Sequence, residues 1–323
     1  MNTAPERGEH PVLTVIRERL AAGSLPGQRS DPYRVALAIE GGGNRGIISG
    51  GMAQALYEHG LLTAFDAMYG SSSGALTAVW LLAEDLPTAL TAWTDAKFMA
   101  RFATPTNLLR RRPLVDLEWL TTKYYDRTLS LDTARVLASP ITMHPLATDT
   151  ATGRPVDLHP FIVDKATLYL AMRASAALPV VAGRPVELNG SRYLDAGLVE
   201  TVPLDTPLTS GVTHMLVLSS RREGDVSHDS PMVQRVTGAW LRRAAPATRQ
   251  PFLQRGAYAA AVAERLAKHN IDYDTLPAVF TIRPAPDSRA IGRMTANADE
   301  LRAGLAAGRA AMLGALSTAS FIS

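Results

Sequence analysis

The sequence predicts a single α/β domain with a mainly parallel central sheet. Two short apolar runs, at 35–40 and 65–69, are each followed by a glycine-rich turn and then by apolar residues at helical spacing. Corresponding points of the two units, Gly42 and Ser72, lie thirty residues apart. This is about the length of one βαβ unit, so two parallel strands would end side by side. With 323 residues, 46% of them hydrophobic, the chain can bury a large core.

The first glycine-rich turn has the features of an anion-binding loop. Its residues are Gly41, Gly42, Gly43, Asn44, Arg45 and Gly46. Consecutive glycines have no β-carbons, so the backbone can take positive φ and turn its N–H groups outward together. A helix begins directly behind them, and the positive end of its dipole favours negative charge at the same place. A nucleotide cradle is the alternative, but no Gly-Lys-Ser/Thr follows and no acidic ribose contact stands at a clear second strand about 20 residues on.

The second turn fits the G-x-S-x-G pattern of a nucleophile elbow through Gly70, Ser72 and Gly74. In such an elbow the flanking glycines permit a strained strand-to-helix turn that exposes one hydroxyl group. The Oγ of Ser72 would lie at a helix N-terminus, where an alkoxide or an oxyanion is favoured. We therefore expect Ser72 to be a nucleophile that faces the N–H groups of the first turn.

A third motif, Asp195-Ala196-Gly197, follows a hairpin predicted over 186–194. The hairpin is predicted because Asn-Gly between two alternating runs is the strongest short-range signal for a tight turn. A carboxylate can accept the proton of a serine hydroxyl if it lies within hydrogen-bond reach. We expect Asp195 to be this base, and the small residues Ala196 and Gly197 to let the loop approach the elbow.

These three motifs, in this order and at this spacing, resemble the signature of the patatin-like phospholipase family over residues 33–205. The resemblance implies a three-layer α/β/α fold with the nucleophile on a strand-to-helix elbow. It also implies a Ser-Asp dyad, Ser72 and Asp195, that hydrolyses lipid esters without histidine. We expect the N–H groups of Gly42 and Gly43 in the glycine loop to hold the oxyanion. The chain departs from the family pattern at three places. Glutamate replaces aspartate at Glu40, alanine replaces glycine at Ala196, and Glu200-Thr201-Val202-Pro203 lacks the asparagine common before the proline.

The expected activity is that of a phospholipase A, a lysophospholipase or a lipid acyl hydrolase working through an acyl-enzyme. One alternative is a non-catalytic module that binds an anionic ligand or a lipid. Another is a soluble carboxylesterase with a Ser-His-Asp triad, for which His144, His159 and His214 are the histidines to test. Because no calcium-binding loop or acidic cluster is present, we expect neither a metal nor a cofactor. Asp195 must stay ionised, so a cation is expected nearby, and Arg45 is the nearest candidate by sequence. Arg45 would stabilise either the glycine loop or the anionic site, and the sequence favours neither role.

The composition narrows the partners and the location. Formal net charge is +3, the sequence pI is about 9.2 and no dense basic tract is present, so nucleic acid is not an expected partner. The absence of cysteine excludes disulfides and thiolate metal sites. The first residues lack an apolar segment and no stretch gives 18 apolar residues in a row. We therefore expect a cytoplasmic protein, and peripheral contact with a membrane is compatible with the sequence. Nothing in it sets the oligomeric state.

We divide the chain into an N-terminal extension and linker at 1–32 and a hydrolase domain at 33–323. Segment 98–130 interleaves apolar residues with arginine, which fits either contact with an anionic membrane or lipid headgroup or an ordinary helical lid. Segment 221–253 is rich in charge, and both segments are candidates for a lid over the site. Gly50 and Gly51 weaken their helix, either to allow a close approach to the serine helix or because helix starts tolerate weakness.

Periodicity predicts further elements in order: helices at 12–20, 47–59, 75–86, 168–177, 256–269 and 299–316, and strands at 141–149, 214–220 and 279–282.

Overall fold

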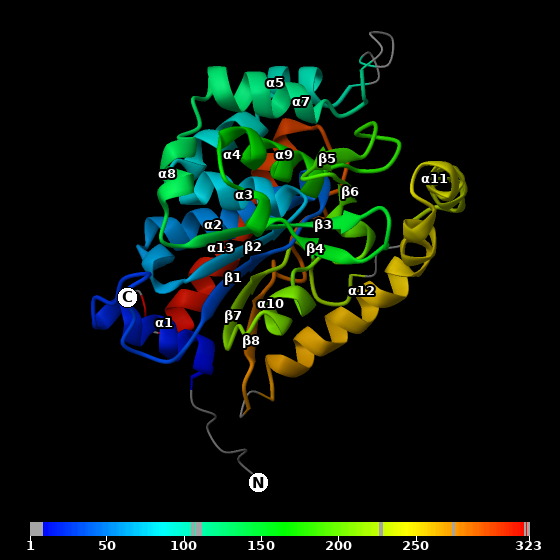
Figure 1. Ribbon diagram of the computed structural model, residues 1–323. Coiled ribbons are helices and arrows are strands. Elements are labelled where there is room, and N and C mark those ends of the chain that lie inside the picture. The colour runs from blue at the N-terminus through cyan, green and yellow to red at the C-terminus, as the bar shows by residue number, and fades with distance from the viewer. Residues whose placement is uncertain are drawn as a thin grey trace.

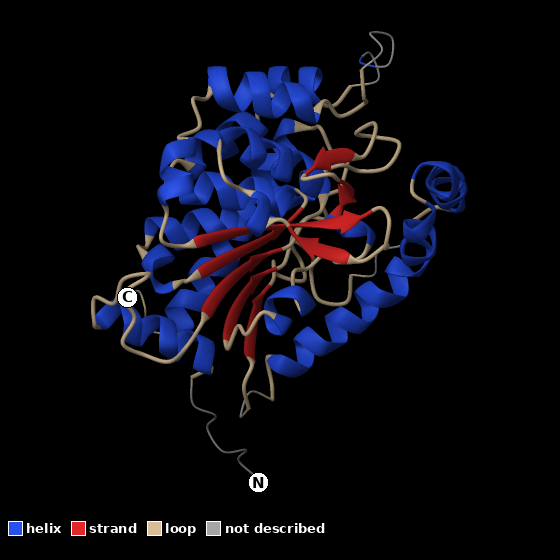
Figure 2. Cartoon of the chain, viewed as in Figure 1, coloured by secondary structure: helices blue, strands red, loops and turns tan. Residues whose placement is uncertain are grey.

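The computed structural model describes residues 9–104, 107, 112–225, 229–272, 275–319 and 321. In this part of the chain an eight-stranded sheet lies between layers of helices (Figures 1 and 2). The strand order is β5-β6-β3-β2-β1-β7-β8, and β4 pairs with β3. Strands β3, β2, β1, β7 and β8 are parallel, whereas β4, β5 and β6 pair antiparallel. The sheet is therefore mainly parallel, as predicted.

The strands are β1 Val35–Ile39, β2 Ala67–Ser71, β3 Thr142–Asp149, β4 Pro155–Asp157, β5 Val186–Leu188, β6 Ser191–Asp195, β7 His214–Leu218 and β8 Ala278–Ile282. The α-helices are α1 Pro11–Ala21, α2 Ile47–Glu58, α3 Ser73–Leu82, α4 Leu86–Trp93, α5 Ala96–Phe102, α7 Leu117–Trp119, α8 Thr133–Ala138, α9 Lys165–Ser175, α10 Asp205–Thr209, α11 Pro231–Ala244, α12 Arg249–His269 and α13 Ala298–Thr318. Other helical turns are η1 Gly43–Gly46, η2 Leu61–Ala64, the π-helix η3 Leu120–Thr128, η4 His159–Phe161, η5 Ala196–Leu198 and η6 Pro246–Thr248.

Strand β1 shows how the two helical layers pack on the sheet. Its larger side chains, Val35, Leu37 and Ile39, join the core formed with α1, α2, α3 and α13. The alternate residues, Ala36 and Ala38, face the opposite core, to which α12 contributes. All five residues are fully buried, because a central parallel strand is covered on both faces. The result is the predicted three-layer α/β/α arrangement.

Glycines allow α2 and α13 to pack with their backbones in contact. A β-carbon on Gly51 would lie 2.2 Å from the carbonyl oxygen of Leu305, and one on Gly308 would lie 1.9 Å from that of Ile48. A β-carbon on Gly50 would meet Leu90 of α4 at 2.7 Å. The glycine pair in α2 is therefore explained by close approach, but the prediction that the neighbour is the serine helix is wrong.

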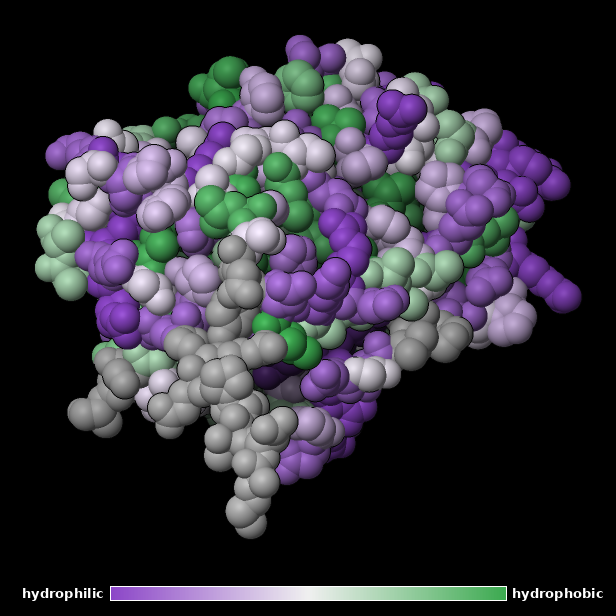
Figure 3. Space-filling view, turned by 90° about the horizontal axis from the view of Figure 1, so that it is seen from below, coloured by the Kyte–Doolittle hydropathy of each residue, from purple (hydrophilic) through white to green (hydrophobic). Residues whose placement is uncertain are grey.

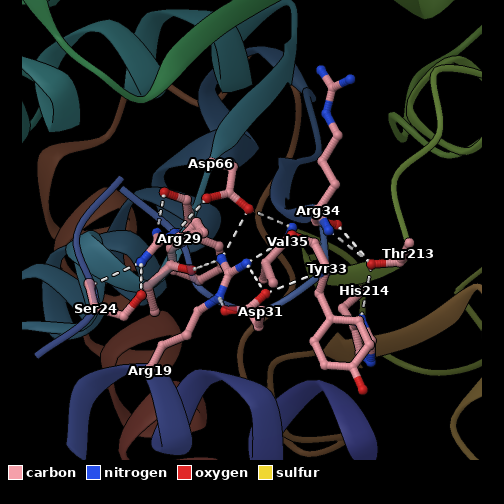
Figure 4. A network of polar contacts seen from close by, with 12 residues as sticks. Arg19, Ser24, Arg29, Asp31, Tyr33, Arg34, Val35, Asp66, Thr213 and His214 are labelled. Carbon is pink, nitrogen blue, oxygen red and sulfur yellow. Dashed lines mark hydrogen bonds and ion pairs between the residues drawn. The ribbon is translucent and has the colours of Figure 1, made fainter. Parts of the chain in front are cut away.

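A buried arginine ties α1 to the beginning of the sheet (Figure 4). Arg19 is 2% exposed and donates hydrogen bonds to Asp31 at 2.7 Å and to Asp66 at 2.8 Å. Asp66 in turn accepts the backbone N–H of Val35, the first residue of β1, at 2.8 Å. Val12 of α1 is fully buried in the same core as β1. The division of the chain at residue 32 stays a prediction.

The two segments expected to cover the site are mostly helical. Segment 98–130 contains most of α5 and all of α7 and η3, and its aromatic side chains pack together, with the rings of Phe98 and Tyr124 4.6 Å apart. Segment 221–253 contains α11, which stands to one side of the molecule in Figure 1. Residues 105–106, 108–111 and 226–228 of these segments lie outside the described residues. Their covering role stays a prediction.

The molecular surface is mixed in character. Figure 3 shows hydrophilic and hydrophobic residues interspersed on the face seen from below Figure 1. Among the described residues, the most exposed large apolar side chains are Val163 and Met232, the second of which belongs to α11. No helix in the described part of the chain has both the length and the apolar composition needed to cross a bilayer.

Candidate active site

Ser72 and Asp195 come together although 123 residues separate them in sequence. Ser72 directly follows β2, and Asp195 is the last residue of β6, with β3 lying between these two strands. The Ser72 hydroxyl donates a hydrogen bond to Asp195 Oδ2 at 2.7 Å. Ser72 is 7% exposed and Asp195 is 1% exposed, so the pair lies in a nearly closed site.

The backbone around Ser72 has the geometry of a nucleophile elbow. Ser72 has φ 55° and ψ −124°, a conformation that is strained for a residue with a β-carbon. A β-carbon on Gly70 would lie 2.5 Å from the Cα of Ala75, and one on Gly74 would lie 2.1 Å from the carbonyl oxygen of Ile39. Only glycine fits at both positions, because the elbow packs directly against its own helix and against β1. The G-x-S-x-G pattern is therefore a steric requirement of this turn.

The glycine loop lies directly against the elbow. A β-carbon on Gly41 would come within 2.8 Å of the Ser72 β-carbon, and one on Gly46 would come within 2.3 Å of Ser73 Oγ. The N–H of Gly41 donates to Thr201 O at 3.2 Å. The N–H of Gly42 donates to Ser73 Oγ at 3.1 Å.

The remaining glycine of the triplet differs from its neighbours. Gly43 has φ +57°, and its N–H has no hydrogen-bond acceptor among the residues that the structure describes. A β-carbon at this position would lie 2.6 Å from the carbonyl oxygen of Arg293, which also accepts the N–H of Asn44 at 2.9 Å. The Arg293 backbone thus holds the loop in place. Of the three consecutive glycines, only Gly43 has an N–H without a described protein acceptor.

Burial dominates the electrostatics of Asp195. Burial raises the pKa of Asp195 to about 6, although hydrogen bonds from Ser72 and Gly197 favour the ionised form. The Gly197 N–H donates to Asp195 Oδ1 at 2.6 Å. The charges of Arg255 and Arg293 also favour the carboxylate. Among the described residues, these arginines are the leading cationic influence on Asp195, whereas the printed partners of Arg45 are Glu40 and Ser220.

Arg45 instead belongs to a network around Glu40 on another side of the glycine loop. Its Nε donates to Ser220 Oγ at 3.0 Å, and its Nη2 lies 3.7 Å from Glu40 Oε1. Glu40 is fully buried and also accepts hydrogen bonds from Ser220 N at 2.7 Å and Arg221 Nε at 2.9 Å. Burial favours its neutral form, but Arg221 and Arg45 hold the pKa of Glu40 below its usual range. Glu40 is thus an anchor for the loop.

Glu200 fixes the aspartate loop at the place where the sequence departs from the family pattern. Its carboxylate accepts hydrogen bonds from Leu204 N at 2.9 Å and from Thr206 Oγ1 at 2.5 Å. Its carbonyl oxygen accepts the hydroxyl of Ser71 at 2.7 Å, which joins this loop to the elbow. The carboxylate therefore holds the loop without an asparagine.

The three histidines considered for a triad have other partners. His144 Nδ1 lies 2.6 Å from Asp157 Oδ2, and His159 Nδ1 lies 3.0 Å from the carbonyl oxygen of Met143. His214 stands at the first position of β7, where its Nδ1 lies 3.0 Å from Thr213 Oγ1. Within the described residues, no histidine forms a hydrogen bond with Ser72 or Asp195.

A narrow apolar slot begins beside the glycine loop. Gly43 and Ser73 form part of its wall, and Trp80, Leu90 and Tyr125 are among its apolar lining residues. Its volume is about 30 Å³, so side chains fill most of the space between α2, α3 and α4. In the described part of the chain no group of three or more His, Cys, Asp or Glu residues is arranged to hold a metal ion.

Sequence reasoning missed one residue that contacts the pair and two arginines whose charges act on Asp195. Ser175, the last residue of α9, accepts the Ser72 N–H through its Oγ at 3.0 Å. Arg255 lies on α12 and Arg293 in the loop before α13, about 60 and 100 residues after Asp195. Neither arginine stands in a motif, and the chain is rich in arginine. Ser175 likewise stands outside the three motifs from which the site was predicted.

Comparisons with known proteins bear on this arrangement. The sequence profile described as patatin-like phospholipase matches residues 37–208, which is more than half of the chain. The uncharacterized protein YjjU of Escherichia coli K12 is 28% identical over 189 residues, which cover 58% of this chain and 52% of YjjU. The chain thus matches about half the length of that curated relative. The crystal structure of VipD from Legionella pneumophila aligns with a TM-score of 0.41 and 12% identity, over 93% of this chain and 73% of VipD.

Proposed function

Because this chain belongs to the patatin-like phospholipase family, we propose that it is a serine hydrolase that cleaves carboxylic ester bonds of lipids. The observation that carries the proposal is the 2.7 Å hydrogen bond from Ser72 Oγ to Asp195 Oδ2, at an elbow that holds the serine at the start of α3. A hydroxyl paired with a buried carboxylate at a helix N-terminus is an arrangement that suits nucleophilic catalysis.

The proposed reaction has two stages. Ser72 Oγ attacks the ester carbonyl carbon while Asp195 accepts its proton, which forms a tetrahedral oxyanion. The intermediate collapses, the carbon–oxygen bond to the alcohol breaks, and Asp195 returns the proton to the leaving oxygen. Water then attacks the acyl-enzyme with Asp195 as the base, and release of the carboxylic acid restores the Ser72 hydroxyl.

We assign the principal oxyanion donor to the N–H of Gly43. It has no acceptor among the described residues, and the Arg293 carbonyl fixes the loop around it through Asn44. The N–H of Gly42 can contribute only when its 3.1 Å bond to Ser73 Oγ gives way. Removal of a single donor from such a site typically costs ~10²–10³ in rate.

The apolar slot beside Gly43 supports an ester with an acyl chain as the substrate. Trp80, Leu90 and Tyr125 would surround hydrocarbon, and the lining residue Ser73 adjoins the nucleophile in sequence. Since the slot has a volume of about 30 Å³, a long chain could enter only if side chains moved. The described conformation therefore suits only the shortest acyl chains, and a medium chain requires the same movement of side chains.

We also propose that α11 provides contact with lipid. Its exposed apolar residues are Met232, Val233 and Val236, and Arg242 and Arg243 stand in its last turn. Apolar and basic residues on one surface helix favour an anionic membrane surface. The helix lies in segment 221–253, one of the two segments expected to cover the site.

Hydrolysis of a lipid panel tests the proposal. The wild type, Ser72→Ala and Asp195→Asn would be assayed on phospholipids, lysophospholipids, glycerides and simple esters, and Ser317→Ala at the exposed end of α13 would be the matched serine control. We expect the wild type and Ser317→Ala to release fatty acid, and both site variants to lose at least ~10² in rate. Hydrolysis of simple esters alone would identify a soluble carboxylesterase.

The competing functions give different results in the same assay. A binding module would show no turnover in the wild type. A triad enzyme would lose its turnover when His144, His159 or His214 is replaced by glutamine, whereas a Ser72–Asp195 pair keeps turnover after each replacement. The partners of the three histidines favour the pair.

A further inference from the structure

We propose that a cavity next to the glycine loop, separate from the Ser72–Asp195 pair, binds a phosphate group. The cavity has a volume of about 230 Å³, and its polar lining includes Arg45, Ser220, Arg221, Arg222, Ser288 and Arg289. Neither Ser72 nor Asp195 lines it. The volume far exceeds the roughly 30 Å³ that one water molecule occupies in the liquid, so a hydrated tetrahedral anion has space there.

The charge around this cavity is mainly positive. Among the described residues, four arginines and a single carboxylate, Asp225, line it. Arg222 pairs with Asp225 at 2.9 Å, and Arg289 pairs at the rim with Glu300 at 2.7 Å. The buried Glu40 forms ion pairs with both Arg45 and Arg221. The four guanidinium groups therefore pair with only three carboxylates, those of Glu40, Asp225 and Glu300, which leaves one positive charge in excess. We place this excess charge at the buried Arg45.

Two buried polar groups at the cavity lack hydrogen-bond partners. Arg45 Nη2 and Ser288 Oγ are both inaccessible and have no acceptor or donor among the described residues. An unsatisfied buried polar group costs roughly 1–3 kcal/mol, and more when it is charged. Both side chains line the cavity, and each could donate to a phosphate oxygen once its covered polar atom turns toward the cavity. Burial also lowers the pKa of Arg45 to about 10, although Glu40 opposes the change, so the guanidinium remains charged at neutral pH.

This cavity is coupled to the glycine loop through Gly42. A β-carbon on Gly42 would lie 3.0 Å from Arg45 Nη2 and 3.2 Å from Ser220 Oγ, whereas one on Gly41 would meet Ser72. The loop therefore contacts the elbow through one glycine and the arginine cluster through the next. An anion that holds Arg45 would stabilise the loop in the conformation that leaves the Gly43 N–H available.

Direct binding of inorganic phosphate tests this site independently of catalysis. Isothermal titration with phosphate, at constant ionic strength, would use protein carrying Ser72→Ala so that turnover plays no part. We expect saturable binding to one site. Ser288→Ala and Arg45→Gln should each weaken it by about tenfold or more, because each removes a hydrogen bond to a charged group. Arg302→Gln is the matched control, since Arg302 lies on α13 and pairs with Asp299 outside the cavity.

Vesicles distinguish a free phosphate from a lipid headgroup. Phosphatidylcholine vesicles with and without phosphatidate would be added to the same Ser72→Ala protein. If the natural ligand is a headgroup, phosphatidate should increase vesicle binding, phosphate should compete with it, and Ser288→Ala should abolish the increase. If it is a free phosphate, the vesicles should leave the titration unchanged.

Two results would overturn the site. One is the absence of saturable phosphate binding by the folded Ser72→Ala protein. The other is an equal loss of phosphate binding in Arg302→Gln and Ser288→Ala. Phosphate bound in the cavity should depend on Ser288, which lines it, and not on Arg302, which lies outside it. Arg45→Gln could unfold the loop by releasing Glu40, whereas Ser288→Ala removes only one unpaired hydroxyl, so the second variant decides the test.

Discussion

In the proposed mechanism, Asp195 has to be ionised to accept a proton from Ser72, yet it is only 1% exposed. Burial raises its pKa to about 6, well above the ordinary value for an aspartate. A base with a pKa just below neutrality is ionised at pH 7 and still binds a proton strongly, which suits general base catalysis. The two arginines that act on this carboxylate, Arg255 and Arg293, keep the pKa from rising further.

The first prediction concerns the dependence of turnover on pH. If Asp195 is the base, kcat/KM should increase with pH, reach half of its maximum near pH 6 and level off at higher pH, because the carboxylate is the active form. Initial rates on a water-soluble ester between pH 4.5 and 8 measure this. A profile that stays flat from pH 5 to pH 8 would rule out Asp195 as a base with a raised pKa.

Asp195→Asn should have opposite effects on activity and stability. The folded state binds the Asp195 proton more tightly than the unfolded chain does, so this residue lowers stability as pH rises from about 4 to about 6. A neutral asparagine avoids this cost and can keep the Gly197 bond. We expect the variant to be inactive and, at pH 7, more stable by roughly 2–3 kcal/mol in urea unfolding.

Asp205→Asn is the matched control for that measurement. Burial opposes ionisation of Asp205, but hydrogen bonds from Arg265 and Tyr258 hold its pKa below the usual value. Its charge therefore stabilises the fold at pH 7, and this variant should lose stability. A decrease in stability for Asp195→Asn would mean that the ionised carboxylate stabilises the folded state.

At the level of single residues, the sequence predicted Ser72 and Asp195 because each sits in a motif with its own local steric or turn requirement. Gly70 and Gly74 mark the elbow, since larger residues would collide with Ala75 and Ile39. Arg255 and Arg293 had no such signal. Their proximity to Asp195 arises from the packing of α12 and of the loop before α13, which no local pattern encodes.

Among the elements, the sequence predicted those whose periodicity or turn chemistry is local. Strand β1, the hairpin of β5 and β6, and the long helix α13 lie where expected. The π-helix η3 was not predicted. Its sequence has no feature that separates it from an ordinary helix. In the fold, its Tyr125 packs against Trp80 of α3, with ring centroids 5.1 Å apart.

The packing of α13 on α2 gives a prediction for two glycines of one helix. Gly308→Ala should destabilise the protein by roughly 1–3 kcal/mol, because its β-carbon would overlap the carbonyl oxygen of Ile48. Gly314→Ala should be neutral or stabilising by up to about 1 kcal/mol, because no atom lies within 4 Å and alanine favours helix. Urea unfolding compares the two. Equal effects would show that the close helix contact is absent in solution.

Across the whole molecule, the sequence could not predict the strand order or the contribution of α1. The position of β7 next to β1, and of β6 next to β3, depends on contacts between segments far apart in the chain. The region up to residue 32 was predicted as an extension because glycine, serine and proline recur after α1. Its Arg19 network, with partners at Asp31 and Asp66, combines residues that have no sequence relation to one another.

A substitution in that network tests whether α1 is part of the folding unit. Arg19→Leu should destabilise the protein by roughly 3 kcal/mol, because it leaves Asp31 and part of Asp66 without a cation. Arg17→Leu is the control, because Arg17 is half exposed and pairs with Glu9 at the surface, where loss costs less than about 1 kcal/mol. If the midpoint of urea unfolding is the same for both variants and the wild type, α1 is an independent extension.

Covalent labelling with a fluorophosphonate, read by mass spectrometry of the digested protein, tests most directly whether Ser72 is a nucleophile activated by Asp195. The account predicts one adduct, on the peptide that contains Ser72, with no adduct in Ser72→Ala and at least ~10²-fold slower labelling in Asp195→Asn. An adduct on another residue, or equal labelling of wild type and Asp195→Asn, would contradict it.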